Sequence, residues 1–113
     1  MKTALKLLVI AGIAIVAPAV ASAGEATDNW NTHCKKCHGP DGAGATPAGK
    51  ALHLKDYTKA DVQAALKDDE MIKAIKEGVK NSAGKTVMSG FSEKLADDEV
   101  ASLVALIRTF KKG

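Results

Sequence analysis

The sequence predicts a small all-α domain, and three observations support this fold class. The closing run, residues 97–112, carries apolar residues at the spacing of one helix face, with acidic residues first and lysines last. Irregular glycine-containing segments, the first of them also rich in proline, interrupt the helical runs at residues 39–49 and 79–91. No segment alternates apolar and polar residues as a half-buried strand does, and no internal repeat is present.

The predicted helices, in chain order, cover residues 26–37, 58–67, 68–78 and 97–112. In the first, Trp30 and Cys34 lie four residues apart and so share one face. The second begins with Thr58, followed three residues later by Asp61, which is an acceptable N-terminal cap. The third begins with three acidic residues, which the helix dipole favours, and Gly78 is a natural C-terminal stop.

The N-terminal residues have the pattern of a signal peptide. A positive start precedes an apolar run at residues 7–17, and the small residues at 21–23 fit the rule for cleavage. This run is shorter than the ~20 residues that a membrane-spanning helix needs, and an uncleaved anchor is the alternative. We therefore expect a signal peptide at residues 1–23, one mature domain at residues 24–113, and export to the periplasm or an equivalent compartment.

The mature domain is short and nearly neutral. The chain has 16 basic and 13 acidic residues, and removing Lys2 and Lys6 with the leader leaves 16 − 2 = 14 basic residues. Nucleic-acid binding usually requires a clustered basic excess, so it is not expected. Few aromatic residues are present to build a core, and short chains often need a cofactor to complete one. A large apolar group would fit well in the centre of such a domain.

The candidate cofactor site is the run Cys34-Lys-Lys-Cys37-His38, for which several chemistries can be compared. A disulfide between cysteines three residues apart would close a tiny loop and stabilise little. A dithiol redox pair of the thioredoxin type requires a βαβ setting, which is not predicted. Zinc would need a fourth ligand, and neither His33 nor His53 has the spacing of a zinc site.

Covalent haem attachment uses every residue of this motif. Thiols on adjacent helical turns, Cys34 and Cys37, can form thioethers with the two vinyl groups of one haem. The histidine that follows, His38, is then placed to be an axial ligand of the iron. The sequence therefore predicts one covalently bound haem c per chain.

Met88 is the preferred second axial ligand. Apart from the initiator, the methionines are Met71 and Met88. Met71 belongs to an apolar row on a predicted helix, which indicates a core residue. Met88 lies in the irregular segment between two glycines, where the backbone can approach a ring closely, and a methionine thioether is a known partner of histidine on haem iron. His53 is the weaker alternative, and His33 is expected to point to solvent.

The chain resembles class I cytochromes c, particularly the small monohaem bacterial and photosynthetic members. The residues that carry this resemblance are Trp30 and the runs at residues 34–44, 75–79, 85–91 and 95–110. The resemblance implies that about four helices wrap around one covalently bound haem. It also implies that Trp30 packs against the last helix, that Met88 is the distal ligand, and that the carbonyl of Pro47 accepts a hydrogen bond from Nδ1 of His38.

The predicted function is one-electron transfer by a soluble, exported and monomeric carrier. With His38 and Met88 filling both axial positions, the iron would change oxidation state without binding a substrate, so enzyme activity is not expected. Lysines 35, 36 and 85 would steer the carrier toward acidic faces of redox partner proteins. The alternatives are a haem enzyme or gas-binding sensor with an open sixth position, and an electron-transfer subunit of a larger oxidoreductase.

Overall fold

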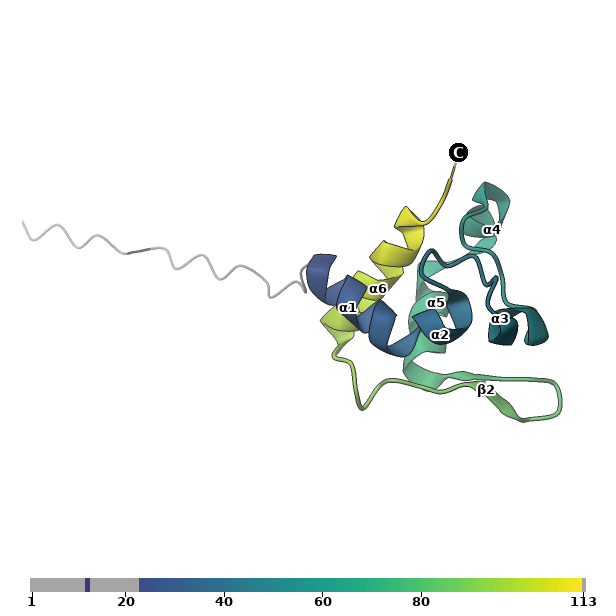
Figure 1. Cartoon of the computed structure of the whole chain (residues 1–113). Coiled ribbons are helices and arrows are strands. Elements are labelled where there is room, and N and C mark those ends of the chain that lie inside the picture. Colours follow the sequence, from purple (N-terminus) through teal and green to yellow (C-terminus); the bar gives the residue numbers. More distant parts are fainter. Residues whose placement is uncertain (1–11, 13–22, 113) are drawn as a thin grey trace, which may run out of the picture.

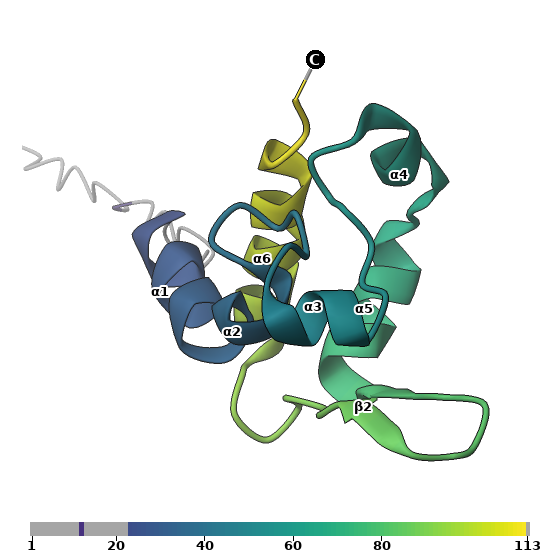
Figure 2. The ribbon, with the colours of Figure 1, turned by 45° about the vertical axis from the view of Figure 1, so that its right-hand side comes forward.

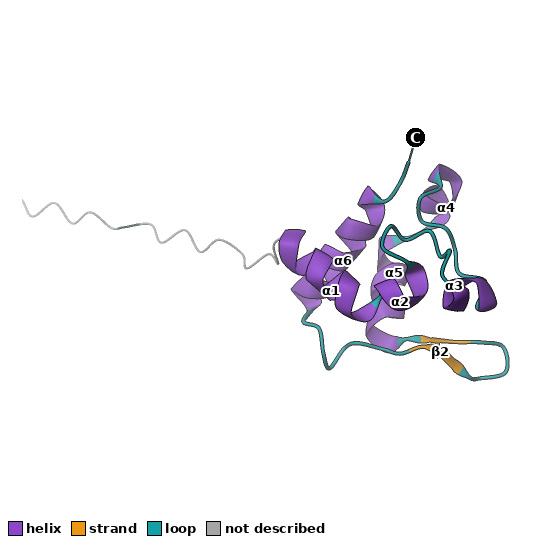
Figure 3. Cartoon of the chain, in the orientation of Figure 1, coloured by secondary structure: helices purple, strands orange, loops and turns teal. Residues whose placement is uncertain are grey.

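The computed structural model describes Gly12 and residues 23–112 of the 113-residue chain. The elements in this part are α1 Ala23–His33, α2 Lys35–His38, α3 Pro47–Ala51, α4 Ala60–Ala65, α5 Asp68–Glu77, β1 Val79–Lys80, β2 Thr86–Met88 and α6 Asp97–Thr109. The mostly helical architecture confirms the predicted fold class (Figures 1 and 3). The predicted signal peptide lies outside the described residues except for Gly12 and Ala23. Within residues 23–112, no helix is long and apolar enough to cross a membrane.

The core lies where α1 and α5 pack against α6 (Figure 1). Val100 and Leu103 of α6 are completely buried, and Trp30 of α1 is 3% exposed. The Trp30 ring meets the ring of Phe110 edge-on, with 4.9 Å between centroids, so it packs against the end of the last helix as the resemblance implied. Its indole nitrogen donates a hydrogen bond of 2.9 Å to the carbonyl of Gly39. Burial of each such large side chain contributes about 1.5–3 kcal/mol to stability.

The first predicted helix is interrupted at the motif. Helix α1 ends at His33, and Cys34 has φ −117° and ψ −36°, which bends the chain before α2 begins. Backbone hydrogen bonds nevertheless run through the bend, from the amide of Cys34 to Trp30 and from the amide of His38 to Cys34, both 2.9 Å. The prediction of one continuous helix over residues 26–37 was therefore wrong at Cys34. Helical hydrogen bonds still hold the motif on both sides of the bend.

One helix and two strands begin in segments that were expected to be irregular. Helix α3 begins in the proline-rich loop, because the side chain of Thr46 accepts a hydrogen bond of 2.9 Å from the amide of Gly49 and Pro47 occupies the first helical position. Strands β1 and β2 pair as an antiparallel hairpin, with Val79 opposite Met88. This hairpin projects beyond the end of α5 (Figure 2).

A polar network joins α6 to the segment between α4 and α5. Arg108 donates hydrogen bonds to the carbonyl groups of Gln63 and Leu66, at 2.6 and 2.8 Å, and to the carboxylate of Asp68 at 2.8 and 3.0 Å. The buried side chain of Gln63 in turn donates to the carbonyl groups of Tyr57 and Ile107, at 2.7 and 2.8 Å. The network thus holds the position of Tyr57, which lies in the candidate site.

Candidate functional site

All four predicted site residues line one cavity of about 550 Å³. Cys34, Cys37 and His38 reach it from the bend and from α2, and Met88 reaches it from the end of β2. The fold thus brings together two segments that are far apart in the chain. Met71 of α5 and His53, the alternatives at the sixth position, line the same cavity.

The cavity is lined mainly by apolar side chains. One wall is the buried core, to which Ile75, Leu103 and Ile107 contribute. Leu52 and Val79 also line the cavity, and among the described residues they are the large hydrophobic side chains that are exposed, at 40% and 39%. A bulky, flat and apolar group in this cavity would cover both the core wall and the exposed side chains of Leu52 and Val79. The lining is suited to haem.

No disulfide joins Cys34 and Cys37. Cys34 is 7% exposed, and its burial, together with the nearby Cys37 thiol, raises the pKa of Cys34 to about 11. The folded chain therefore keeps this thiol protonated near neutral pH, although the thiolate is the reactive form. Among the described residues, no group of three or more histidine, cysteine or acidic side chains is arranged to hold a metal ion.

The imidazole of His38 lies between two aromatic rings. The Tyr57 ring stacks on it, with 5.5 Å between centroids and 18° between planes, and the Trp30 ring lies tilted at 5.6 Å. Burial lowers the pKa of His38, so the imidazole is neutral near pH 7. A neutral imidazole has a free nitrogen lone pair, which binding to iron requires.

The hydrogen bond expected between His38 and Pro47 is absent from this structure. Nδ1 of His38 is buried and has no hydrogen-bond partner. Pro47 begins α3, and a carbonyl at that position is directed along the helix axis toward the next turn. The loop is held instead by Thr46, whose hydroxyl donates a hydrogen bond of 2.5 Å to the carbonyl of Cys37. Ring packing, and not this hydrogen bond, orients the imidazole here.

Sequence reasoning missed Tyr57, which is half-buried beside His38. Burial, followed by the nearby Cys34 thiol, raises the pKa of Tyr57, so its hydroxyl stays protonated over the physiological range. Tyr57 could have been suspected as a site residue from the sequence, because it is an isolated aromatic residue between two predicted helices. His33 was expected to point to solvent, but it is half-buried, contacts the Phe91 ring at 5.1 Å between centroids, and lines the cavity.

The possible sixth ligands differ in their settings. Met71 is 6% exposed and belongs to the core cluster, whereas Met88 is half-buried and packs against that cluster from the hairpin. His53 is exposed and has φ +54°, a left-handed conformation just after the end of α3. Met71 and Met88 both line the cavity, and Met88 differs from Met71 in lying outside the buried core cluster.

This fold and this cavity define a small helical protein built to carry a cofactor on a Cys-x-x-Cys-His motif. Residues 23–111 match the family model for Cytochrome c, and the chain belongs to this family. Its cofactor is therefore a covalently bound c-type haem with iron, and its chemistry is haem-based electron transfer.

Solved structures that are similar to the chain are c-type cytochromes. The KustC0563 c-type cytochrome is 37% identical, with a TM-score of 0.66, over 77% of this chain and 98% of that chain. A tyrosine-to-phenylalanine mutant of Kustc0563 is 36% identical, with a TM-score of 0.64, over 77% of this chain and 99% of that chain. No curated protein matches the chain.

Proposed function

We propose that the chain is an exported one-electron carrier whose haem is attached through Cys34 and Cys37 and ligated by His38 and Met88. The observation that carries this proposal is the meeting of two cysteines that form no disulfide, a neutral imidazole and a thioether at one mainly apolar cavity. The bound haem supplies the redox chemistry, in which iron alternates between the ferrous and ferric states.

The residues around the cavity would tune this chemistry without taking part in bond formation. His38 donates its lone pair from a ring held by Tyr57 and Trp30, and Met88 offers a soft sulfur that favours ferrous iron. The apolar lining disfavours the additional charge of the oxidised state and so raises the reduction potential. With His38 and Met88 as the two protein ligands of the iron, no position would be left for a substrate, so we propose a carrier and not an enzyme.

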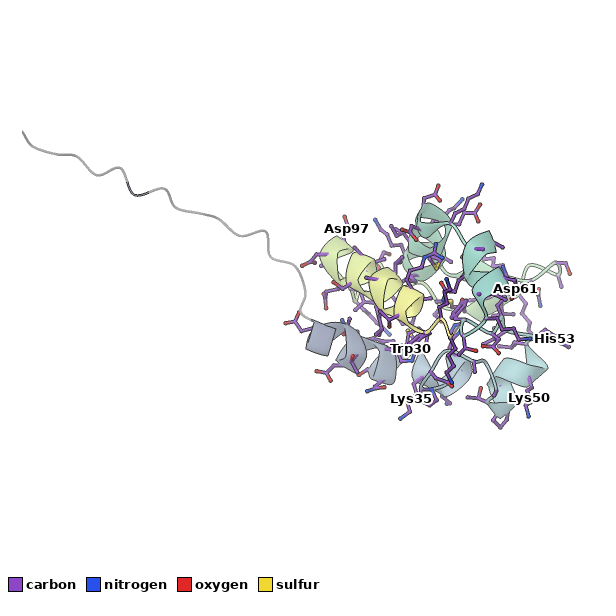
Figure 4. All side chains as sticks on the ribbon, turned by 90° about the horizontal axis from the view of Figure 1, so that it is seen from above. Trp30, Lys35, Lys50, His53, Asp61 and Asp97 are labelled. Atoms are coloured by element: carbon purple, nitrogen blue, oxygen red, sulfur yellow. The ribbon has the colours of Figure 1, made fainter. Side chains whose placement is uncertain are left out.

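The charge distribution supports contact with acidic redox partners. Lys35 and Lys36 are exposed beside the motif, and Lys55 lines the cavity. Lys50 lies across the molecule from Asp97, the first residue of the acidic turn of α6 (Figure 4). Such a polarity orients a carrier before contact and raises the rate of association at low salt.

Carbon monoxide binding separates this proposal from its alternatives. We expect the ferrous wild-type protein not to bind carbon monoxide, because Met88 occupies the sixth position, and the ferric protein to show the weak far-red sulfur–iron absorption band. Rapid carbon monoxide binding by the wild-type protein would mean an open position, as in a haem enzyme or gas sensor.

Haem attachment is tested with the cysteines. Replacing both, Cys34→Ala with Cys37→Ala, should leave haem that acid-acetone extraction removes, while each single variant keeps one thioether or loses haem. Haem that resists extraction in the double variant would contradict attachment through these thiols.

A further inference from the structure

The hairpin that carries Met88 follows the end of α5 (Figures 1 and 2). It leaves α5 at Gly78 and returns to it at Gly90, and neither glycine has room for a side chain. A Cβ atom on Gly78 would lie 2.5 Å from the carbonyl oxygen of Met88 and 2.7 Å from the amide nitrogen of Gly90. A Cβ atom on Gly90 would lie 2.6 Å from the carbonyl oxygen of Lys76 and 2.8 Å from the carbonyl carbon of Glu77. The two ends of the hairpin therefore touch backbone to backbone.

Hydrogen bonds hold the same junction. The amides of Phe91 and Ser92, directly after Gly90, donate to the carbonyl oxygens of Ile75 and Lys76 at 2.8 and 3.2 Å. These bonds satisfy carbonyl groups at the C-terminal end of α5, which have no partner within the helix. The returning strand is thereby attached to α5 immediately beyond Met88.

The outer part of the hairpin offers no comparable support. Residues 79–86 are exposed. At the turn, Gly84 has φ +77°, and a Cβ atom there would meet nothing within 4 Å. The contacts that fix the position of Met88 consequently lie at the base of the hairpin and not at its tip.

We propose that Gly78 and Gly90 form a backbone clasp that positions Met88, so that its sulfur stays within reach of the iron. This inference rests on the proposed function, in which Met88 is the axial ligand. Gly78 touches the carbonyl of Met88 itself, so a displacement at the clasp moves the ligand directly. The two glycines are positioning residues that do not themselves contact the cofactor through a side chain.

The glycines of this hairpin provide a matched set of variants. Gly90 lacks the left-handed conformation, so Gly90→Ala tests close packing alone, whereas Gly84→Ala introduces left-handed strain without a contact. Gly78→Ala combines both effects, since Gly78 has φ +81°. Each haem-loaded variant would be compared with wild type by the far-red sulfur–iron band, by carbon monoxide binding in the ferrous state, and by circular dichroism.

We expect Gly90→Ala and Gly78→Ala to lose the sulfur–iron band while retaining helical content. Their ferrous forms should bind carbon monoxide, which the ferrous wild-type protein is expected not to bind, because backbone strain at either glycine displaces Met88. Gly84→Ala should keep the band and resist carbon monoxide. An intact band in Gly90→Ala, or equal loss in Gly84→Ala, would overturn the clasp.

Two further measurements cover the remaining outcomes. Met88→Ala must abolish the sulfur–iron band, and if the band remains, the proposed ligand is wrong. If Met88→Ala abolishes the band but Gly90→Ala keeps it, only the clasp is refuted. If the clasp variants do not load haem, hydrogen exchange of the wild-type holoprotein decides. The clasp requires the amides of Phe91 and Ser92 to exchange as slowly as those within α5, and rapid exchange at both would refute it.

Discussion

Replacement of Arg108 by alanine should destabilise the holoprotein well beyond the loss of a surface ion pair. Its guanidinium group bonds the carbonyl groups of Gln63 and Leu66 just at and beyond the last residues of α4, as well as the carboxylate of Asp68. A hydrogen bond to a charged group contributes about 1.5–3 kcal/mol. Because the side chain of Arg108 is one-third exposed, we discount this sum for solvent, and we expect a loss of about 2–4 kcal/mol.

Chemical denaturation monitored by circular dichroism would measure this change as a lower midpoint at an unchanged slope. Asp68→Asn removes only the exposed ion pair and should cost about 0–1 kcal/mol. Arg108→Lys keeps the charge but lacks the planar fork, so it should recover less than half of the loss. Equal destabilisation by Arg108→Ala and Asp68→Asn would refute the reasoning, since the carbonyl contacts would then contribute nothing.

Three other outcomes concern the core, the cofactor and pH. Met71→Ala should keep the sulfur–iron band and lower the free energy of unfolding by about 2–5 kcal/mol, because Met71 is buried; loss of the band would make Met71 the ligand. The apoprotein should show no cooperative thermal transition by circular dichroism, because the cavity separates the walls of the domain, and a native-like melt would contradict this. The pKa of Glu99 is lowered by the amide of Ala96 first and then by Asn29. Its contribution is present above the usual glutamate value of about 4.5 and is lost as pH falls through the lower folded pKa, so Glu99→Gln should flatten the acid side of a plot of melting temperature against pH. An unchanged acid limb would show that these hydrogen bonds do not couple to folding.

Residue types and local spacing were sufficient to predict α5 and the start of α6, and they selected the candidate site residues that line the cavity. Helix α5 runs from Asp68 to Glu77 where residues 68–78 were predicted, and α6 begins at Asp97 as predicted. Periodic apolar residues and acidic first turns are local signals, so they do not depend on the rest of the fold. Met88 was separated from Met71 by the same means, because only Met71 belonged to a helical row.

The remaining features depend on contacts between distant segments. The stacking of Tyr57 on His38 follows from the path of the loop after α3, which Gln63 and Arg108 hold from other helices. Strands of two and three residues are too short to show an alternating pattern, so the hairpin was predicted as irregular. The hydrogen bond expected between His38 and Pro47 also depends on a distant loop, in which Thr46 caps a short helix that begins at Pro47, and Nδ1 of His38 has no partner there.

The packing of α1 on α6 determines when the cysteines are accessible during assembly. Leu103 and Ile107, near the end of the chain, line the cavity beside the motif at its beginning, and contacts between such distant residues form only after a long loop closes. During synthesis from the N-terminus, Cys34 therefore emerges well before α6, whose residues belong to the same buried cluster. In that open chain its thiol lacks the burial that raises its pKa, so thioether formation is easiest before the last helix docks.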